Sequence, residues 1–277
     1  MAGVKAVKTY RSKEMEIADD LVAVEEPLEI RIGYGAEGER HQKSVSVTMR
    51  TPGTDEELAL GFLYTEGVIT SVHDVVSIKP CFDGKDQLNE YVIRAELAPD
   101  VNVDLDRLSR NFYTSSSCGV CGKASIEAVQ FQSSRKLHDY LKTVTLEEIQ
   151  LMPALLQGEQ TNFRHTGGIH AVGLFTREGR LLMAREDVGR HNAMDKMIGA
   201  ALLNSQINTS SCMVLVSGRA SFELVQKAVV AEIPVMAAVG APSSLAIELA
   251  EEYGMTLIGF LREDRYNVYA HPSRIAQ

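Results

Sequence analysis

Two cysteines placed three positions apart form the part of the sequence that could most directly do chemistry. Cys118 and Cys121 are separated by a glycine and a valine, and Lys123 follows them at the start of a helical pattern over 124–131. A position near a helix N-terminus, together with a lysine, favours the thiolate, which is the nucleophilic form of cysteine. The neighbouring glycines have no side chains, so the cysteine loop could approach the active site of another macromolecule closely. The pair is therefore a candidate for covalent chemistry at sulfur.

Residue spacing alone leaves four interpretations of this pair open. A structural zinc site would need Cys81, Cys212 or a histidine as further ligands, and none of them forms a second close pair. A thioredoxin-like redox pair should follow a buried strand, but residues 113–117 are polar. A carrier that holds a sulfur atom as a persulfide fits an exposed nucleophile, and an inert buried pair stays open beside it. We expect Cys81 and Cys212 to be small buried hydrophobic residues.

Three turns between an expected strand and an expected helix form a second candidate site. They lie at residues 186–191, 217–221 and 240–244. In a parallel sheet all three would lie at the carboxyl ends of the strands, where open α/β folds bind ligands and where free backbone N–H groups suit phosphate. The pattern predicts that the guanidiniums of Arg190, Arg219, Arg262 and Arg265 converge on one pocket, as a nucleotide pyrophosphate would require.

Each of these residues also has a purely structural interpretation. Serine or aspartate caps occur on most helices, so a single turn need not bind anything. His191 would serve equally as an acid or base and as a capping partner of Asp187. His170 on an apolar strand fits a satisfied core histidine. Arg190, with Asp195 and Lys196, fits a solvated helix face.

Hydrophobic periodicity and turn residues predict the elements that position these groups. In the first half we expect a β-hairpin of strands 28–32 and 44–49, a helix capped by Thr54 and stopped at Gly67, strands at 74–81 and 90–97, and a short helix at 105–110. In the second half we expect strands at 168–175, 180–186, 212–217, 234–239, 255–261 and 266–270, with helices at 191–203, 221–232 and 243–253.

These elements predict an α/β fold. Short apolar strands alternating with helices indicate a largely parallel sheet covered on both faces in the second half. We expect a flexible N-terminus over 1–20, a mixed α+β domain over 21–135 that ends in the cysteine loop and its helix, and an α/β domain over 136–277.

Composition narrows the class of protein. The chain has 277 residues, 45% of them hydrophobic and 23% charged, which is ordinary for a folded globular protein. Its formal charge of −9 argues against a nucleic-acid partner, because phosphate neutralisation needs an excess of lysine and arginine. The apolar run at 233–247 contains two prolines and is too short to span a membrane. Without a secretory signal and with few cysteines, the chain is expected to be cytoplasmic with reduced thiols.

Five ordered segments together resemble those of the formate dehydrogenase accessory sulfurtransferases, the FdhD/NarQ family. They are GFLYTEG at 61–67, CGVCG at 118–122, EDVGRHNAMDK at 186–196, SGRAS at 217–221 and GFL at 259–261. The resemblance implies a cytidine-deaminase-like three-layer αβα domain and a homodimer. It also implies transfer of sulfur from a cysteine desulfurase to the molybdenum cofactor, in its bis-molybdopterin guanine dinucleotide form, before insertion into formate dehydrogenase.

The resemblance also assigns residues. It implies that Cys118 carries the persulfide, with Cys121 assisting or relaying. The cofactor would bind at Phe260, Leu261, Arg262, Glu263, Asp264 and Arg265, which join Ser217, Arg219, Arg190 and His191 of the turns, and a guanine nucleotide would mimic it. Glycine is common in that family at 263–264, where this chain has glutamate and aspartate.

We expect no resident metal. Deaminase activity is not expected. Deaminases of this fold have a catalytic glutamate two residues after the histidine of a His-x-Glu motif, and the second residue after His170 is not a glutamate. The alternative function is a cofactor-binding chaperone without sulfur transfer.

Overall fold

A four-stranded sheet forms the core of the N-terminal half. The structure is a computed structural model that describes residues 3–11, 16–82, 87–104, 137 and 143–276. Strands β3 (Glu26–Tyr34) and β4 (His41–Arg50) form the expected hairpin, and β6 (Leu88–Leu97) joins β3 in parallel while pairing antiparallel with β5 (Val75–Phe82). Alternate residues of β3, namely Leu28, Ile30 and Ile32, are buried on one face. The sheet order is β4-β3-β6-β5.

Helix α1 (Asp55–Thr65) follows this hairpin where the sequence predicts it, but the expected cap is not made. Thr54 occupies the N-cap position with a left-handed backbone at φ 54°, and its side chain accepts no capping hydrogen bond. Asp55, Glu56 and Glu57 lie in the first turn, where negative charge suits the helix dipole. Acidic first-turn residues therefore replace the predicted threonine cap.

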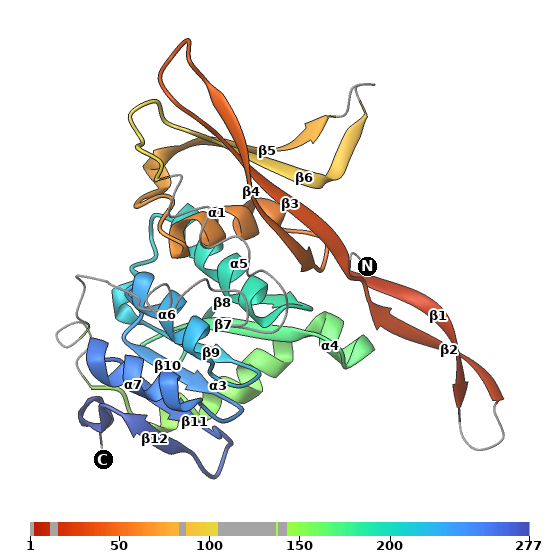
Figure 1. Cartoon of the computed structure of the whole chain (residues 1–277). Coiled ribbons are helices and arrows are strands. Elements are labelled where there is room, and N and C mark those ends of the chain that lie inside the picture. The colour runs from red at the N-terminus through yellow and green to blue at the C-terminus, as the bar shows by residue number, and fades with distance from the viewer. Residues whose placement is uncertain (1–2, 12–15, 83–86, 105–136, 138–142, 277) are drawn as a thin grey trace.

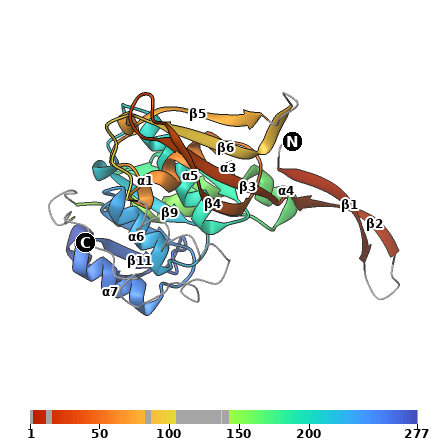
Figure 2. The ribbon, with the colours of Figure 1, turned by 45° about the horizontal axis from the view of Figure 1, so that its top comes forward.

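Regular structure begins earlier than the sequence predicts. Strands β1 (Val4–Arg11) and β2 (Glu16–Ala23) form an antiparallel two-stranded ribbon. Figure 1 and Figure 2 both show this ribbon projecting from the rest of the molecule. The expectation that the first twenty residues lack regular structure is therefore wrong, and its predicted boundary at residue 20 falls inside β2.

The C-terminal half contains a six-stranded sheet in the order β12-β11-β10-β9-β7-β8. The strands are β7 (His170–Thr176), β8 (Leu181–Asp187), β9 (Cys212–Val216), β10 (Val235–Ala238), β11 (Thr256–Gly259) and β12 (Asn267–Ala270). Strands β9, β10 and β11 are parallel, whereas β7 and β12 run the other way. The sheet is therefore mixed, and the prediction of a largely parallel sheet holds only at its centre. Strand β8 pairs antiparallel with β7 and so runs in the direction of β9.

Helices cover both faces of this sheet, which makes the three layers that the sequence predicts. Along β9, Val214 and Val216 join the core with α5 (Arg190–Leu203), α6 (Phe222–Val230) and α7 (Ser244–Tyr253). Met213 and Leu215 point to the opposite face, into a second core with α3 (Leu146–Glu159). The short helix α4 (Thr161–Thr166) then leads into β7. The fold is mixed α/β with several sheets.

Helices α3 and α4 are absent from the sequence prediction. Pro153 lies inside α3, where a proline normally argues against a helix. A capping box marks its start, because Thr145 accepts from the backbone of Glu148 and the Glu148 side chain accepts from the backbone of Thr145. The predicted helices at 105–110 and 124–131 lie outside the described residues. So does the predicted domain boundary at 135–136, which stays a prediction.

The two halves share one hydrophobic core. Residues from the N-terminal sheet and α1 belong to the same buried cluster as residues from α5, α6, α7 and the large sheet. Figure 1 shows α1 lying against α5 between the two sheets. Burial on both sides of α1 therefore fixes the N-terminal half against the helices that begin at the candidate site.

Candidate functional site

The three predicted turns lie along one edge of the large sheet. Because β8, β9 and β10 run in the same direction, the turns that follow them leave the sheet at the same edge. Backbone hydrogen bonds join the turns at 217–221 and 240–244 directly: Gly240 donates to the Gly218 carbonyl at 2.8 Å, and Ser243 donates to the Ala220 carbonyl at 3.0 Å. Phe260, after β11, donates to the Gly240 carbonyl at 3.0 Å. The carboxyl ends of the strands thus form one continuous edge, as predicted.

Four arginines on this edge have no carboxylate partner within the described residues. They are Arg190, Arg219, Arg262 and Arg265. Elsewhere, arginines are commonly paired with carboxylates, as shown by Arg31, Arg40, Arg50, Arg94, Arg177, Arg180 and Arg185. Arg190 and Arg219 lie next to the N-termini of α5 and α6, where unpaired guanidiniums suit an anionic ligand. Arg262 already donates at 2.8 Å to the carbonyls of Val239 and Leu261, so it also holds the end of β10 in place.

The segment 260–265 presents its residues unequally. Phe260 adopts a left-handed backbone at φ 53° and leaves 42% of its surface exposed. Leu261 is fully buried in the core on the α3 side, so only its backbone can face a ligand. The next residues form a turn closed by the Arg262 amide donating to the Arg265 carbonyl at 2.8 Å, and Asp264 lies exposed in that turn.

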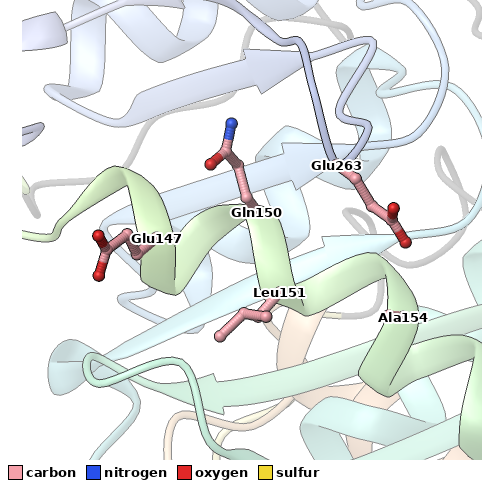
Figure 3. A pocket seen from close by; sticks show the side chains of 5 residues that line it. All are labelled: Glu147, Gln150, Leu151, Ala154 and Glu263. Carbon is pink, nitrogen blue, oxygen red and sulfur yellow. The ribbon is translucent and has the colours of Figure 1, made fainter.

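Glu263 lies apart from the three turns. It lines a cavity of about 460 Å³ with Glu147, Gln150, Leu151 and Ala154 of α3. Figure 3 shows its carboxylate on the loop after β11, across from the side chains of the helix. The structure thus places Glu263 on the α3 side of the sheet, while the turns at 186–191 and 217–221 begin the helices of the other side.

Two histidines and a glutamate meet at the start of α5 and α6. His191 lies 3.8 Å from the Glu223 carboxylate, measured between Nε2 and Oε2, and it lowers the pKa of Glu223 to about 2 against the opposing effect of burial. His170 is half-buried at the start of β7 rather than satisfied in the core. Burial, and then the nearby charges of Arg190 and His191, lower the pKa of His170. Glu223 is a site residue that sequence reasoning missed.

The helix N-termini at this edge differ in their caps. The Ser243 side chain accepts from the Ala246 amide at 3.3 Å and caps α7. Gly189 before α5 and Ser221 before α6 make no side-chain cap. The Ser217 hydroxyl accepts from the Ala171 amide at 2.9 Å and so ties β9 to β7. First-turn amides of α5 and α6 are therefore not occupied by side-chain caps.

The segment 186–196 proves to be largely structural. Asp187 is fully buried and lies 2.7 Å from the Lys196 ammonium, which also donates to the Thr51 carbonyl at 2.8 Å. Asp195 is 2% exposed and lies 2.9 Å from the Lys227 ammonium. The expectation that Asp195 and Lys196 lie on a solvated helix face is therefore wrong, because α5 is covered by α1 and the N-terminal sheet.

The structure tests the predictions for only two of the four cysteines. Cys118 and Cys121 lie outside the described residues, so their chemistry stays a prediction. Cys212 is 4% exposed, as expected, and burial raises the pKa of its thiol to about 11. Cys81 is only partly buried. A thiol with the pKa of Cys212 is a poor nucleophile near neutral pH.

Comparison with known proteins identifies relatives over nearly the whole chain. Residues 23–276 match the family described as the FdhD/NarQ family. Two proteins named sulfur carrier protein FdhD are 52% identical in Mycolicibacterium paratuberculosis, covering 92% of each chain, and 43% identical in Saccharolobus solfataricus, covering 98% of each. A crystal structure of a formate dehydrogenase accessory protein from Desulfotalea psychrophila superposes with a TM-score of 0.73 at 25% identity, covering 99% of this chain and 98% of that one. No helix in the described ranges is long and apolar enough to cross a membrane.

Proposed function

Because the chain belongs to the FdhD/NarQ family, we propose that it is a sulfur carrier that serves the maturation of a formate dehydrogenase. The observation that carries this proposal is the match over residues 23–276, which includes the CGVCG segment. The names of the relatives supply the sulfur-carrier role, and the pair of nucleophilic residue types at 118 and 121 supplies the chemistry. The unpaired arginines at the carboxyl ends of the strands of the large sheet supply a binding site for an anionic client.

Loading transfers one sulfur atom between proteins. The Cys118 thiolate attacks the terminal sulfur of a persulfide on a cysteine desulfurase. The sulfur–sulfur bond of the donor breaks, its cysteine leaves as a thiolate, and Cys118 becomes a persulfide. No net oxidation takes place in this exchange.

Release of sulfide needs two electrons, which Cys121 would supply. Attack of the Cys121 thiolate on the inner sulfur of the Cys118 persulfide forms a Cys118–Cys121 disulfide and expels the outer sulfur as hydrosulfide. The two thiols are oxidised and the transferred sulfur is reduced, so a further round needs an external thiol to reduce the disulfide. If Cys121 only assists, that thiol must act directly on the persulfide.

The client is the molybdenum cofactor in its bis-molybdopterin guanine dinucleotide form. Its diphosphates suit Arg190, Arg219, Arg262 and Arg265 and the uncapped amides of α5 and α6. We place His191, Ser217 and the backbone of 260–265 beside them. Glu263 and Asp264 replace neutral glycine with two carboxylates, so this client must approach on the arginine side of the turn.

A cysteine desulfurase donates the sulfur, formate dehydrogenase receives the completed cofactor, and the chain works as a homodimer in the cytoplasm.

The test is intact-mass spectrometry after incubation with a cysteine desulfurase and cysteine. Wild type should gain the mass of one sulfur atom, removable by reductant, whereas Cys118→Ala should gain none. Cys81→Ala serves as the matched control and should load like wild type. If neither wild type nor Cys118→Ala gains sulfur, the proposal fails in favour of a chaperone that binds the cofactor without sulfur transfer.

A further inference from the structure

A second cavity lies in the N-terminal half, beside the segment whose Thr51 is hydrogen-bonded to Asp187 and Val188 of the first turn. It has a volume of about 280 Å³ and is formed by β3, β5, β6, the end of β4, the start of α1 and the segment between them. Its lining is mostly apolar and comprises Leu28, Pro52, Gly53, Pro80, Leu88, Val92 and Ile93, with Glu26, Arg50, Asp55 and Glu90 as the charged members. Small-molecule sites commonly measure roughly 300–1,000 Å³, so this groove is better matched to one protein side chain.

A buried arginine builds the charged wall of the groove. Arg50 is 1% exposed, and its guanidinium donates to both oxygens of Asp55 at 3.0 and 2.9 Å. It also donates to Glu26 at 3.2 Å and to the Glu90 carbonyl at 3.1 Å. These bonds fix the arginine, the carboxylates of Asp55 and Glu26 and the backbone at Glu90 relative to one another, so this wall of the groove is preformed.

The groove carries an excess of negative charge. The guanidinium of Arg50 pairs with the carboxylates of Glu26 and Asp55, and the Glu90 carboxylate adds a further negative charge to the lining, which leaves a formal charge of −2. The Glu90 side chain is exposed and has no ion pair or hydrogen bond within the described residues. An apolar floor beside unneutralised carboxylates favours a ligand with an aliphatic stem and a cationic head.

Exposed apolar residues continue the groove onto the surface. Leu88 lines the cavity and is 51% exposed, and it pairs across the hairpin with Phe82, which is 67% exposed. Large apolar side chains gathered beside a pocket are typical of protein interaction sites, in which an arginine is often the buried anchor.

We propose that this groove is a docking site for a protein partner that inserts a lysine or arginine side chain. The aliphatic stem of the inserted side chain lies on Leu88, Pro80 and Pro52, and its cationic head lies between Glu90 and Glu26. Phe82 contacts the apolar residues next to the basic one. Binding in this groove does not depend on sulfur transfer, because its lining comes from the N-terminal sheet and the segment that leads into α1.

The test measures binding of two fluorescein-labelled peptides by anisotropy with the full-length protein. One peptide carries a central arginine between two leucines, and the other carries a glutamate in its place. The arginine peptide should bind saturably and more weakly as salt rises, whereas the glutamate peptide should not bind. Equal binding of both peptides, or of neither, overturns the proposal.

Charge reversal at Glu90 locates the site. Glu90→Gln should weaken binding of the arginine peptide roughly two- to fivefold, as expected for an exposed ion pair. Glu90→Lys should abolish that binding and allow the glutamate peptide to bind. Glu248→Gln, an exposed change on α7, is the matched control and should bind like wild type.

A second copy of this chain is the competing occupant. Size-exclusion chromatography with light scattering of wild type and Glu90→Lys decides between them. If Glu90→Lys dissociates a wild-type dimer and wild type binds neither peptide, the groove is an interface between copies and the proposal is wrong. Unchanged oligomeric state together with arginine-dependent binding supports it.

Discussion

Gly61 of α1 and Gly199 of α5 lie where these two helices cross at backbone contact. A Cβ atom added to Gly61 would lie 1.9 Å from the Asp195 carbonyl oxygen, and one added to Gly199 would lie 1.9 Å from the Glu57 carbonyl oxygen. Neither position can carry a side chain without separating the helices. Because α5 begins at the candidate site, this crossing ties the N-terminal sheet to the residues expected to bind the client.

Gly61→Ala should therefore destabilise the protein by about 1–3 kcal/mol or more, although alanine is otherwise favoured in a helix. Urea denaturation measures the free energy of unfolding. Gly158→Ala in α3 is the control, because an added Cβ there meets no atom within 4 Å, and it should be neutral or stabilising. Equal stability of both variants would contradict the close crossing.

The buried pair of Asp187 and Lys196 should respond asymmetrically to mutation. Lys196→Met leaves the fully buried Asp187 carboxylate without its cation, which should cost about 3–5 kcal/mol. The double variant Asp187→Asn with Lys196→Met removes both charges and should recover part of that loss. Urea denaturation measures the free energy of unfolding of the two single variants and the double variant. If the double variant is as unstable as the sum of the two single changes, the pair is not coupled.

Glu223 should add stability that is lost in acid. His191 lowers the pKa of Glu223 from its ordinary value near 4.5 to about 2, so the folded state favours the ionised carboxylate. A lowered pKa contributes stability above pH 4.5 that disappears as the pH falls from about 5 to 2. Wild type should therefore exceed Glu223→Gln in free energy of unfolding at pH 6, and the difference should shrink by pH 3. A difference that does not change over this range would refute the lowered pKa of Glu223.

The edge arginines should bind a guanine nucleotide. Arg190→Ala and Arg219→Ala should each weaken GDP binding about tenfold, the effect of losing one hydrogen bond to a charged group. Isothermal titration calorimetry measures the affinity. Arg177→Ala is the matched control, because Arg177 lies in the β7–β8 turn at the opposite edge of the sheet. Loss of affinity in Arg177→Ala alone would place the site elsewhere.

Local patterns predicted much of the fold because burial follows sequence periodicity closely in these elements. Alternation at 28–32 marks the buried face of β3, and the strands and helices after residue 168 agree with the prediction to within a few residues. Along β4 burial departs from the alternation, because Val45 is buried whereas Val47 and Met49 are exposed. Sheet order was harder, since β7 inserts between β8 and β9, and such pairing depends on contacts distant in sequence.

Only part of the candidate site could be predicted from the sequence. The turns and their arginines could be identified because they follow apolar strands. The burial of Asp195 and Lys196 could not, because the N-terminal half that covers α5 comes from residues more than a hundred positions away. Helix α3 was not predicted, although the capping box of Thr145 and Glu148 marks its start, and its internal Pro153 is unusual for a helix.

Formate dehydrogenase activity in a host that lacks its own family member tests the central claim most directly. Complementation with wild type should restore the activity, and Cys118→Ala should abolish it although the protein is folded and still binds GDP. Cys81→Ala should restore the activity as wild type does. Full activity with Cys118→Ala would contradict the account, because no persulfide could then form at that residue.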